Sequence, residues 1–263
     1  MMKSYREEYG ALLRAIADEA DTMAMTYFRA MGMRVVRKLD GTALTEADGA
    51  IEKMARAKVA ASCAALDVFG EEMGTGDSGA ALKSAGRARL IIDPIDGTEE
   101  FSRGIPTFGT LLGIEDGGEI VAGMASAPAL GARWSAYRGE GAYRDGQRIQ
   151  VSKVARLEEA MVFTTGTGPS KGQEAREKIR RLADAARNGR SIGGFWQHML
   201  VAEGAIDAAL DWTSKPWDLA PLGIIVEEAG GRSTNIRGER TIYTGDFLST
   251  NGLLHEEALS LLQ

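Results

Sequence analysis

The chain has 263 residues, of which 44% are apolar and 26% charged, and its formal net charge at pH 7 is −6. This length and apolar content allow a large buried core, in one domain or in two coupled halves. The acidic balance, and a sequence without a basic segment, argue against nucleic acid as a partner.

The cysteine count and the distribution of apolar residues bear on the compartment. Cys63 is the only cysteine, so no disulfide can form within the chain, which is typical of a reducing cytoplasm. The sequence has no run of 18 apolar residues, and its first residues lack the apolar core of a signal peptide. We therefore expect a cytoplasmic protein without a membrane partner.

The N-terminal part predicts two helices around a short strand. Apolar residues recur every three or four positions over residues 3–31, which indicates a helix. A strand is expected at 34–38. Thr45-Glu46-Ala47-Asp48 has the pattern of a capping box and begins a helix that reaches about residue 66. The cap alone would explain Asp48, so a chemical role for it depends on what this helix start faces.

The stretch from Ile91 to Thr98 carries the plainest chemical signal. Residues 89–92 predict the end of a buried strand, which Pro94 stops. Asp93 and Asp96 follow, three positions apart on a stiffened turn. Carboxylates are the ligands that Mg²⁺ or Ca²⁺ prefers, and the Ile95 carbonyl could add a third oxygen.

The same stretch predicts a helix start. Asp96 is expected at the N-cap, with Glu99 three residues later. A helix N-terminus beside a cation favours an anion, most naturally phosphate, and the Thr98 hydroxyl could orient a water. The alternative is an ordinary capped turn without a ligand.

The following residues predict a sheet and then a change of pattern. Strands are expected at 108–115 and 120–127, joined by the hairpin signal Asp116-Gly117-Gly118, and again at 132–138 and 142–150. This is an antiparallel meander. Strands and helices alternate after residue 160, so we divide the chain into an N-terminal α+β half, 1–145, and a C-terminal α/β half, 146–263, that close one cleft.

Three motifs in register resemble the inositol monophosphatase family. They are Phe69-Gly70-Glu71-Glu72, Asp93-Pro94-Ile95-Asp96-Gly97-Thr98, and Trp217-Asp218-Leu219-Ala220 with Glu228-Ala229-Gly230-Gly231. The resemblance runs from the first helix to Asn251-Gly252. It implies a mixed α/β fold, a layered αβαβα sandwich, usually as a homodimer. It also implies Mg²⁺-dependent hydrolysis of small phosphomonoesters that lithium inhibits.

The resemblance assigns roles to individual residues. The metal ligands would be Glu71, Asp93, Asp96, Asp218 and the Ile95 carbonyl, holding two or three Mg²⁺ ions. Thr98, paired with Asp48, would activate the attacking water, with Glu71 as a further catalytic residue. The amides of Gly97 and Thr98 would hold the phosphate. Glu72 and Lys38 would lie just outside the metal ligands and support the site.

Within the family, the sequence resembles the histidinol-phosphate phosphatase branch. Residues 125–130, 200–207 and 250–255 carry this likeness. It predicts histidinol phosphate, in histidine biosynthesis, as the substrate. The alternatives are an inositol monophosphatase or another sugar-phosphate phosphatase, and a regulatory metal-binding member without turnover.

Three departures from the branch concern the substrate. Asp211 stands where the family commonly has Glu, and Gly194 where the branch often has an acid. Glu99 and Glu100 replace the more usual Lys-Asn or Lys-Ser pair. We expect substrate contacts from Asp211, Gly194 and Phe195. Two aromatic residues, Trp134 and Trp196, are further candidates for substrate contact, with core packing as the alternative.

Overall fold

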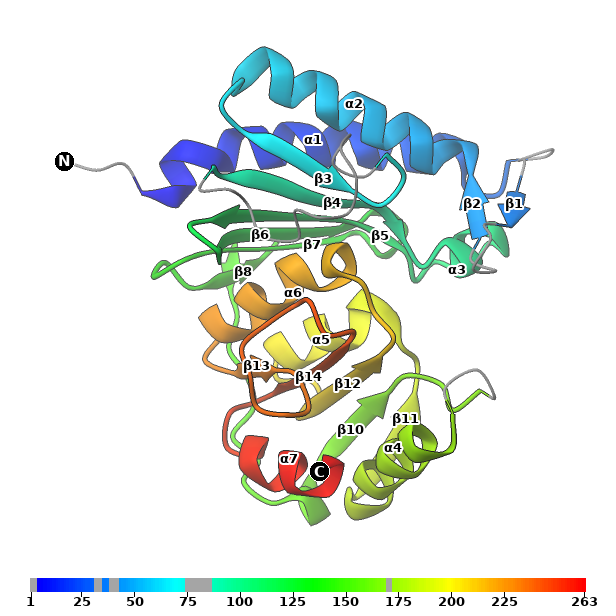
Figure 1. Ribbon diagram of the computed structural model, residues 1–263, viewed down its shortest axis with the longest axis vertical. Coiled ribbons are helices and arrows are strands. Elements are labelled where there is room, and N and C mark those ends of the chain that lie inside the picture. Colours follow the sequence, from blue (N-terminus) through cyan, green and yellow to red (C-terminus); the bar gives the residue numbers. More distant parts are fainter. Residues whose placement is uncertain (1–3, 31–34, 38–42, 74–86, 169–171) are drawn as a thin grey trace.

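Helices and sheets alternate in five layers in the computed structural model, which describes residues 4–30, 35–37, 43–73, 87–168 and 172–263 (Figure 1). The first layer contains α1 (Tyr5–Tyr27) and α2 (Glu46–Ser62), which pack on one face of a seven-stranded sheet. The short hairpin of β1 (Val35–Arg37) and β2 (Ala43–Thr45) precedes α2. The predicted αβαβα architecture is confirmed.

The seven-stranded sheet has the strand order β3-β4-β5-β6-β7-β8-β9. Its strands are β3 (Asp67–Gly70), β4 (Arg89–Asp96), β5 (Gly109–Asp116), β6 (Glu119–Ala127), β7 (Ala132–Tyr137), β8 (Ala142–Arg144) and β9 (Gln147–Arg148). From β4 to β9 it is the expected antiparallel meander, whereas β3 and β4 are parallel. The ends of β3 and β4 therefore lie at the same edge of the sheet.

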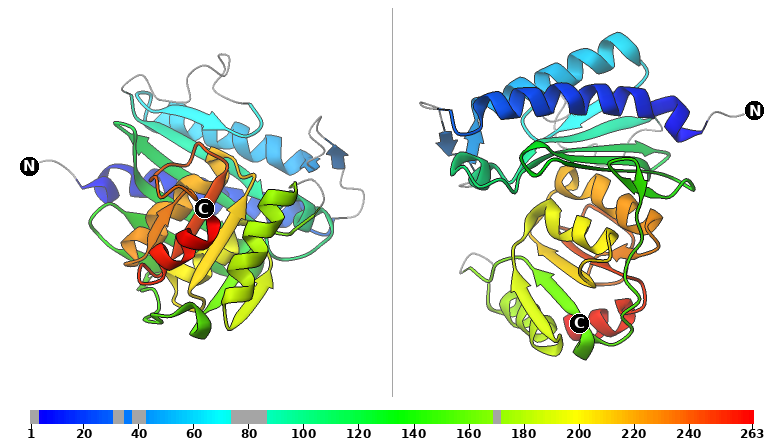
Figure 2. Two further views of the ribbon diagram at one scale, coloured as in Figure 1. Left: turned by 60° about the horizontal axis from the view of Figure 1, so that its bottom comes forward. Right: turned by 180° about the vertical axis from the view of Figure 1, so that it is seen from behind.

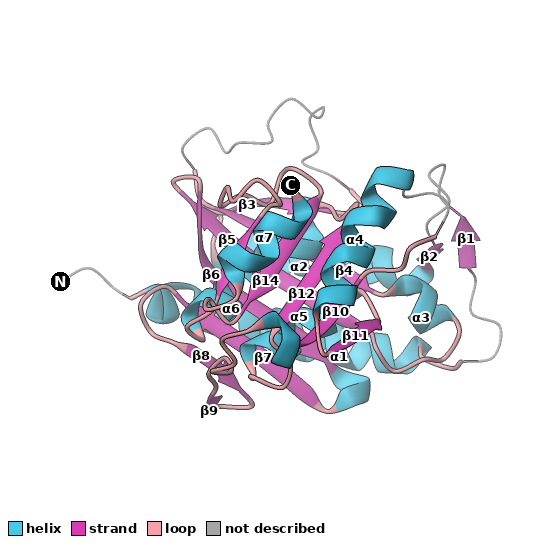
Figure 3. Ribbon diagram, turned by 90° about the horizontal axis from the view of Figure 1, so that it is seen from below, coloured by secondary structure: helices cyan, strands magenta, loops and turns pink. Residues whose placement is uncertain are grey.

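The second sheet has the order β11-β10-β12-β14-β13, with β10 parallel to both of its neighbours. Its strands are β10 (Met161–Thr164), β11 (Asn188–Ser191), β12 (Ala208–Trp212), β13 (Arg232–Thr234) and β14 (Asp246–Thr250). On its outer face lie α4 (Gln173–Ala185) and α7 (His255–Leu262), as Figure 3 shows from below. The first sheet ends at Arg148 and the second begins at Met161, while the division at residue 145 stays a prediction.

The middle layer contains α5 (Gly194–Ala202) and α6 (Pro216–Glu228), which lie between the two sheets in the right view of Figure 2. The approach of α6 to the first sheet is close. A Cβ on Gly113 would lie 2.7 Å from the Ala220 Cβ, and one on Gly123 would lie 2.8 Å from the Pro221 carbonyl oxygen. Two glycines in neighbouring strands thus let α6 pack tightly against the sheet.

Several element boundaries differ from the predictions. The expected N-cap at Asp96 is wrong: Asp96 ends β4, and Gly97, with φ at +81°, is the N-cap of the short helix α3 (Thr98–Ser102). Glycine adopts this left-handed conformation without strain. The first helix ends at Tyr27 rather than at residue 31.

Candidate metal and phosphate site

Three carboxylates meet where β4 ends and α6 begins. Asp93 and Asp96 come from β4 and Asp218 from the first turn of α6. One oxygen of each lies within 4.8 Å of the others. The structure therefore brings together acids that stand more than a hundred residues apart in the sequence.

Backbone amides hold each of these carboxylates in place. The Ile95 N–H donates to Asp93 Oδ1 at 2.9 Å, and the Phe195 N–H to Asp96 Oδ2 at 3.0 Å. The Lys215 N–H donates to Asp218 Oδ2 at 2.8 Å, which is the helix-capping role expected for an acid at this position. Each acid keeps a second oxygen that can bind elsewhere.

Burial and mutual repulsion disfavour the charged form of the three carboxyl groups when no cation is bound. Burial raises the pKa of Asp93 and Asp96 well above the ordinary value. The charges of Glu71 and Asp218 add to the effect at Asp93, and the charge of Asp218 adds to it at Asp96. Burial also raises the pKa of Asp218 to about 7. Among the described residues, no lysine or arginine forms an ion pair with any of the three. A divalent cation would supply the missing positive charge.

These acids line a cavity of about 470 Å³, and all five predicted metal ligands are among its lining residues. Its walls are formed by Arg37, Ala43, Glu71, Asp93, Ile95, Asp96, Gly97, Thr98, Glu99, Glu100 and Asp218. Oxygen donors from carboxylates and a backbone carbonyl are the set that a hard cation such as Mg²⁺ takes. The chemistry of the donor set thus fits a divalent metal.

Thr98 lines the same cavity, and the buried Asp48 lies next to it. The Thr98 hydroxyl is 2.9 Å from the Ile95 carbonyl oxygen and 3.4 Å from Asp48 Oδ1. Asp48 is fully buried, and its other oxygen accepts from the Thr45 amide at 2.8 Å, as expected for a capping box. Because the hydroxyl proton is directed at these acceptors, the lone pairs of Thr98 Oγ1 remain to accept from a water.

The loop after β3 is held by a residue that sequence reasoning missed. Glu52, fully buried on α2, accepts from the Glu72 N–H at 2.7 Å and from the Met73 N–H at 3.2 Å. It therefore fixes the segment that presents Glu71 and Glu72. An acid on the apolar face of a predicted helix was the available signal. Lys38, the other expected contributor, lies outside the described residues.

A second pocket, of about 240 Å³, adjoins the metal cavity. Gly194, Phe195 and Trp196 line it, together with Asp96 and Gly97. The Phe195 ring itself is buried against Trp134, at 6.1 Å between ring centroids.

The other residues expected near the substrate have partners in the core. Asp211 accepts from Gln197 Nε2 at 2.7 Å and lies 3.2 Å from His198 Nε2. Trp134 is buried, and its indole N–H donates to Glu203. Neither residue lines either of the two pockets at the site, so their contact with a substrate stays a prediction.

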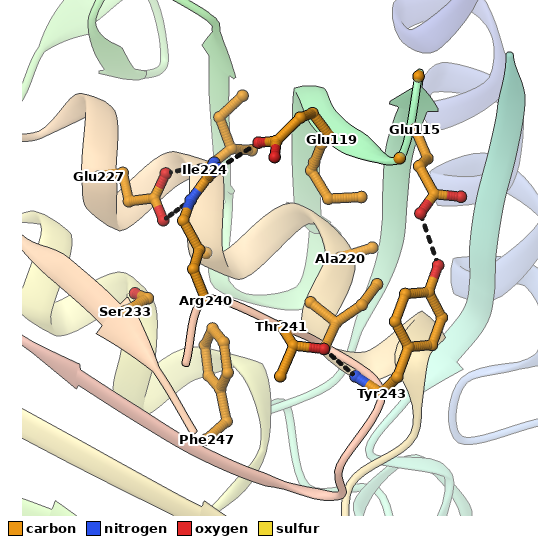
Figure 4. Close-up of a pocket in the computed structure, with 15 residues that line it drawn as sticks. Glu115, Glu119, Ala220, Ile224, Glu227, Ser233, Arg240, Thr241, Tyr243 and Phe247 are labelled. Carbon is orange, nitrogen blue, oxygen red and sulfur yellow. Dashed lines mark hydrogen bonds and ion pairs between the residues drawn. The ribbon is translucent and has the colours of Figure 1, made fainter. Parts of the chain in front are cut away.

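A larger cavity, of about 580 Å³, lies elsewhere, between the β5–β6 hairpin, α6 and the segment before β14 (Figure 4). Tyr243 donates to Glu115 at 2.7 Å there, and Arg240 bridges Glu227 and Glu119. Glu115 also forms a buried ion pair with Arg89, at 2.6 Å. These charges are paired with one another, which indicates a structural role, whereas Asp93, Asp96 and Asp218 form no ion pair with a lysine or arginine in the described part of the chain.

Buried acids around a cavity, beside a hydroxyl, are the arrangement expected of a metal-dependent hydrolase. Comparison with known proteins identifies the family. The model of the inositol monophosphatase family matches residues 6–263, and the chain belongs to this family. The family is metal-dependent, and its members are phosphatases that hydrolyse small phosphate esters. This protein is therefore a phosphatase that acts on a phosphorylated metabolite.

Individual relatives agree with this assignment. The chain is 39% identical over 256 residues to a histidinol-phosphatase of Mycobacterium tuberculosis, covering 95% of this chain and 96% of the relative. A histidinol-phosphatase of Streptomyces coelicolor is 35% identical, with 95% of each chain covered.

Solved structures share the fold. An extragenic suppressor protein, suhB, of Bartonella henselae superposes with a TM-score of 0.86 at 25% identity, covering 97% of this chain and 98% of that one. An IMPase of Thermotoga maritima gives 0.84 at 28% identity, with 97% and 96% covered. Among the described residues, no helix is both long and apolar enough to cross a membrane.

Proposed function

We propose that the protein is a Mg²⁺-dependent histidinol-phosphate phosphatase of histidine biosynthesis. The observation that carries the metal assignment is the cluster of Asp93, Asp96 and Asp218, with one oxygen of each within 4.8 Å of the others. The substrate assignment is supported by relatives named histidinol-phosphatase that match over nearly the whole chain. A cytoplasmic homodimer with two or three Mg²⁺ ions per site completes the proposal.

The acids would hold Mg²⁺, with Glu71 and the Ile95 carbonyl as further ligands from the cavity wall. The cation supplies positive charge for the phosphate and for the leaving oxygen, a large part of the ~20 kcal/mol or more that phosphate-monoester hydrolysis requires. The raised pKa values of the acids fit this role, because a bound cation would favour their charged forms.

The chain's own residues would position water and phosphate. Thr98 Oγ1 accepts a hydrogen bond from the attacking water, while its proton is directed at Ile95 or Asp48. Asp48 is held by Thr45 and keeps that hydroxyl oriented. The turn at Gly97 and Thr98 would present backbone amides to the phosphate. A side chain at Gly97 would lie 2.8 Å from the Thr107 carbonyl, so only glycine fits this turn.

The substrate side of the site explains one departure from the branch. Gly194 has φ at +69°, and a Cβ there would lie 3.2 Å from Asp96 Oδ2. An acidic side chain at this position would crowd a proposed metal ligand. If the substrate's ammonium group meets a carboxylate, we propose that the carboxylate comes from another element. Gly194, Phe195 and Asp211 would then shape the pocket or support its wall.

A substrate panel tests the proposal. The purified protein would be assayed for phosphate release with Mg²⁺ from histidinol phosphate, inositol 1-phosphate and fructose 1,6-bisphosphate. We expect the highest kcat/KM for histidinol phosphate, and loss of activity with a chelator that Mg²⁺ restores. A higher kcat/KM for inositol 1-phosphate would favour the second candidate, which the IMPase of Thermotoga maritima supports by its fold. No turnover of any ester would favour a regulatory member.

The same assay tests the lithium expectation. The family resemblance predicts that Li⁺ inhibits at millimolar concentration without competing with the ester. An activity that Li⁺ leaves unchanged would show that the metal site differs from the family's in its post-cleavage state.

A further inference from the structure

The metal cavity and the adjoining pocket share three wall residues, Asp96, Gly97 and Glu100. Because the phosphate would lie at the metal cavity, the alcohol part of the ester would extend into the adjoining pocket. Its remaining walls are formed by Thr107, Thr165, Ile192, Gly193, Gly194, Phe195 and Trp196, and no lysine or arginine is among the lining residues. The pocket that would receive the leaving group is therefore acidic.

Two neighbouring acids differ in their surroundings. Glu99 forms ion pairs with Arg37 and Arg103, both at 2.7 Å, and lines only the metal cavity. Glu100 is half-buried and lines both cavities, and within the described ranges its carboxylate pairs with no cation. Its charge is thus available to a ligand, whereas the charge of Glu99 is already compensated.

The Glu100 carboxylate lies close to the place where the ester would bind. A Cβ built on Gly97 would lie 3.6 Å from Glu100 Oε2, so the carboxylate folds back over the turn that would hold the phosphate. A positive charge placed a few bonds from the ester oxygen would come close to Glu100. A negative charge in the same place would meet both Glu100 and Asp96.

We propose that Glu100 is a specificity-determining residue that selects esters whose leaving alcohol carries a positive charge. This inference rests on the proposed function, since an amino alcohol such as histidinol has such a charge next to the ester carbon. It is separate from the metal assignment, because Glu100 would contact the leaving group, whereas the other acids would bind the metal ion. It also predicts that bisphosphates and phosphorylated acids are poor substrates.

Three small esters of nearly equal length test this selection directly. They are 2-aminoethyl phosphate, 2-hydroxyethyl phosphate and phosphoglycolate, whose leaving groups are cationic, neutral and anionic. In the wild-type protein with saturating Mg²⁺ we expect kcat/KM to fall in this order. An ammonium against a half-exposed carboxylate accounts for a difference of about 5- to 50-fold between the first two.

The variant Glu100→Gln keeps the shape of the side chain and removes its charge. We expect the ratio of kcat/KM between the cationic and neutral esters to fall to near one, while the neutral ester changes little. Glu99→Gln is the matched control, because its charge is compensated and lies outside the leaving-group pocket, and it should keep the wild-type ratio. Glu100→Asp should keep part of the ratio.

Two results would overturn the inference. One is an equal loss on all three esters in Glu100→Gln, and the other is a ratio that Glu99→Gln lowers as much as Glu100→Gln does. Thermal unfolding of each variant checks that the fold is kept. If the charge series holds but histidinol phosphate is not cleaved, the substrate proposal fails while the role of Glu100 stands.

Discussion

Asp48 and Asp218 each cap a helix and also have a proposed role in the site. Both are the third residue of a helix, and each accepts from the backbone N–H of its N-cap residue, Thr45 or Lys215. The remaining oxygen of Asp48 faces Thr98, and Asp218 joins the acidic cluster. A carboxylate has two oxygens, so a structural cap and a chemical role do not compete. The two alternatives considered for Asp48 in the sequence are therefore compatible.

The carboxylate cluster predicts the effect of neutral substitutions. Asp93→Asn or Asp218→Asn should lower kcat about a hundredfold or more, because each acid is proposed to supply charge to the cation. The metal-free variants should be at least as stable as the wild type, since one repelling buried acid is removed. Steady-state kinetics and thermal unfolding measure both effects. Asp67→Asn, at an exposed acid of β3, is the control and should keep full activity.

Thr98 predicts a different pattern, because its proposed role is to orient water rather than to bind metal. Thr98→Ala should lower kcat by about a hundredfold, with little change in the Mg²⁺ concentration needed for half-maximal activity. Thr98→Ser keeps the hydroxyl and should recover most of the rate. If Thr98→Ala instead weakened Mg²⁺ activation and left kcat intact at high Mg²⁺, the residue would belong to the metal site.

At the scale of elements, the loop after β3 depends on α2. Gly70 has no side chain, and a Cβ there would lie 2.4 Å from the carboxyl carbon of Glu52. The small residue thus makes room for the carboxylate that holds the loop. Arg56, one turn further along α2, compensates the Glu52 charge at 2.7 Å. The helix therefore carries a partly buried charged pair that holds the end of the strand.

Glu52→Gln tests this support. One amide oxygen replaces two carboxylate oxygens, so at least one of the loop N–H groups loses its acceptor, which costs about 1–3 kcal/mol of stability. Because Glu71 lies in the same loop, half-maximal activation should need several-fold more Mg²⁺. Thermal unfolding and Mg²⁺ titration of activity measure the two effects. Glu46→Gln, at an exposed acid on the same helix, should change neither. A variant that lost stability alone would show that Glu71 does not depend on Glu52.

Local sequence signals predicted most elements and one edge of the site. Periodicity, the capping box at Thr45 and the hairpin signal at residues 116–118 each depend on a few adjacent residues, and the structure confirms them. The Asp93–Asp96 spacing likewise pointed to a cation. The N-cap was misplaced because Asp96 and Gly97 both suit that position, and the Phe195 amide, about a hundred residues away, holds the Asp96 carboxylate instead.

Contacts between distant elements were beyond the reach of such signals. Asp218 was assigned to the site by resemblance, since nothing local in α6 indicates its neighbours. Three further features depend on how the layers pack. They are the support that Glu52 gives to the loop after β3, the crowding at Gly194, and the separation of Asp211 from both site pockets. These features depend on how elements that are distant in the sequence pack together, and local sequence patterns do not reveal that packing.

At the scale of the molecule, the site lies where two layers meet. β4 belongs to the seven-stranded sheet, while α5 and α6 belong to the layer between the sheets. The Phe195 amide of α5 and Asp218 of α6 both converge on the end of β4. A cation held there would link these layers, so metal binding should stabilise the whole fold rather than a single loop.

The pH dependence of that stabilisation has a definite sign. In the metal-free protein, the pKa of Asp218 rises from its ordinary value of 3.8 to about 7, so the folded state binds its proton more tightly than the unfolded chain does. The contribution of this proton to stability is present at low pH and is lost as the pH rises from about 4 to about 7. Mg²⁺ competes with the proton for the same carboxylates, so its effect should grow over this range.

We therefore expect Mg²⁺ to raise the melting temperature more at pH of about 8 than at pH of about 5.5. At a concentration a hundred times the dissociation constant the gain is about 2.7 kcal/mol, which corresponds to a rise of about 5 °C or more for a chain of this size. Thermal unfolding with Mg²⁺ and with a chelator at the two pH values measures it. Asp93→Asn should lose most of the Mg²⁺-dependent rise. A rise that is equal at both pH values, or that survives in Asp93→Asn, would place the stabilising cation outside the cluster of Asp93, Asp96 and Asp218.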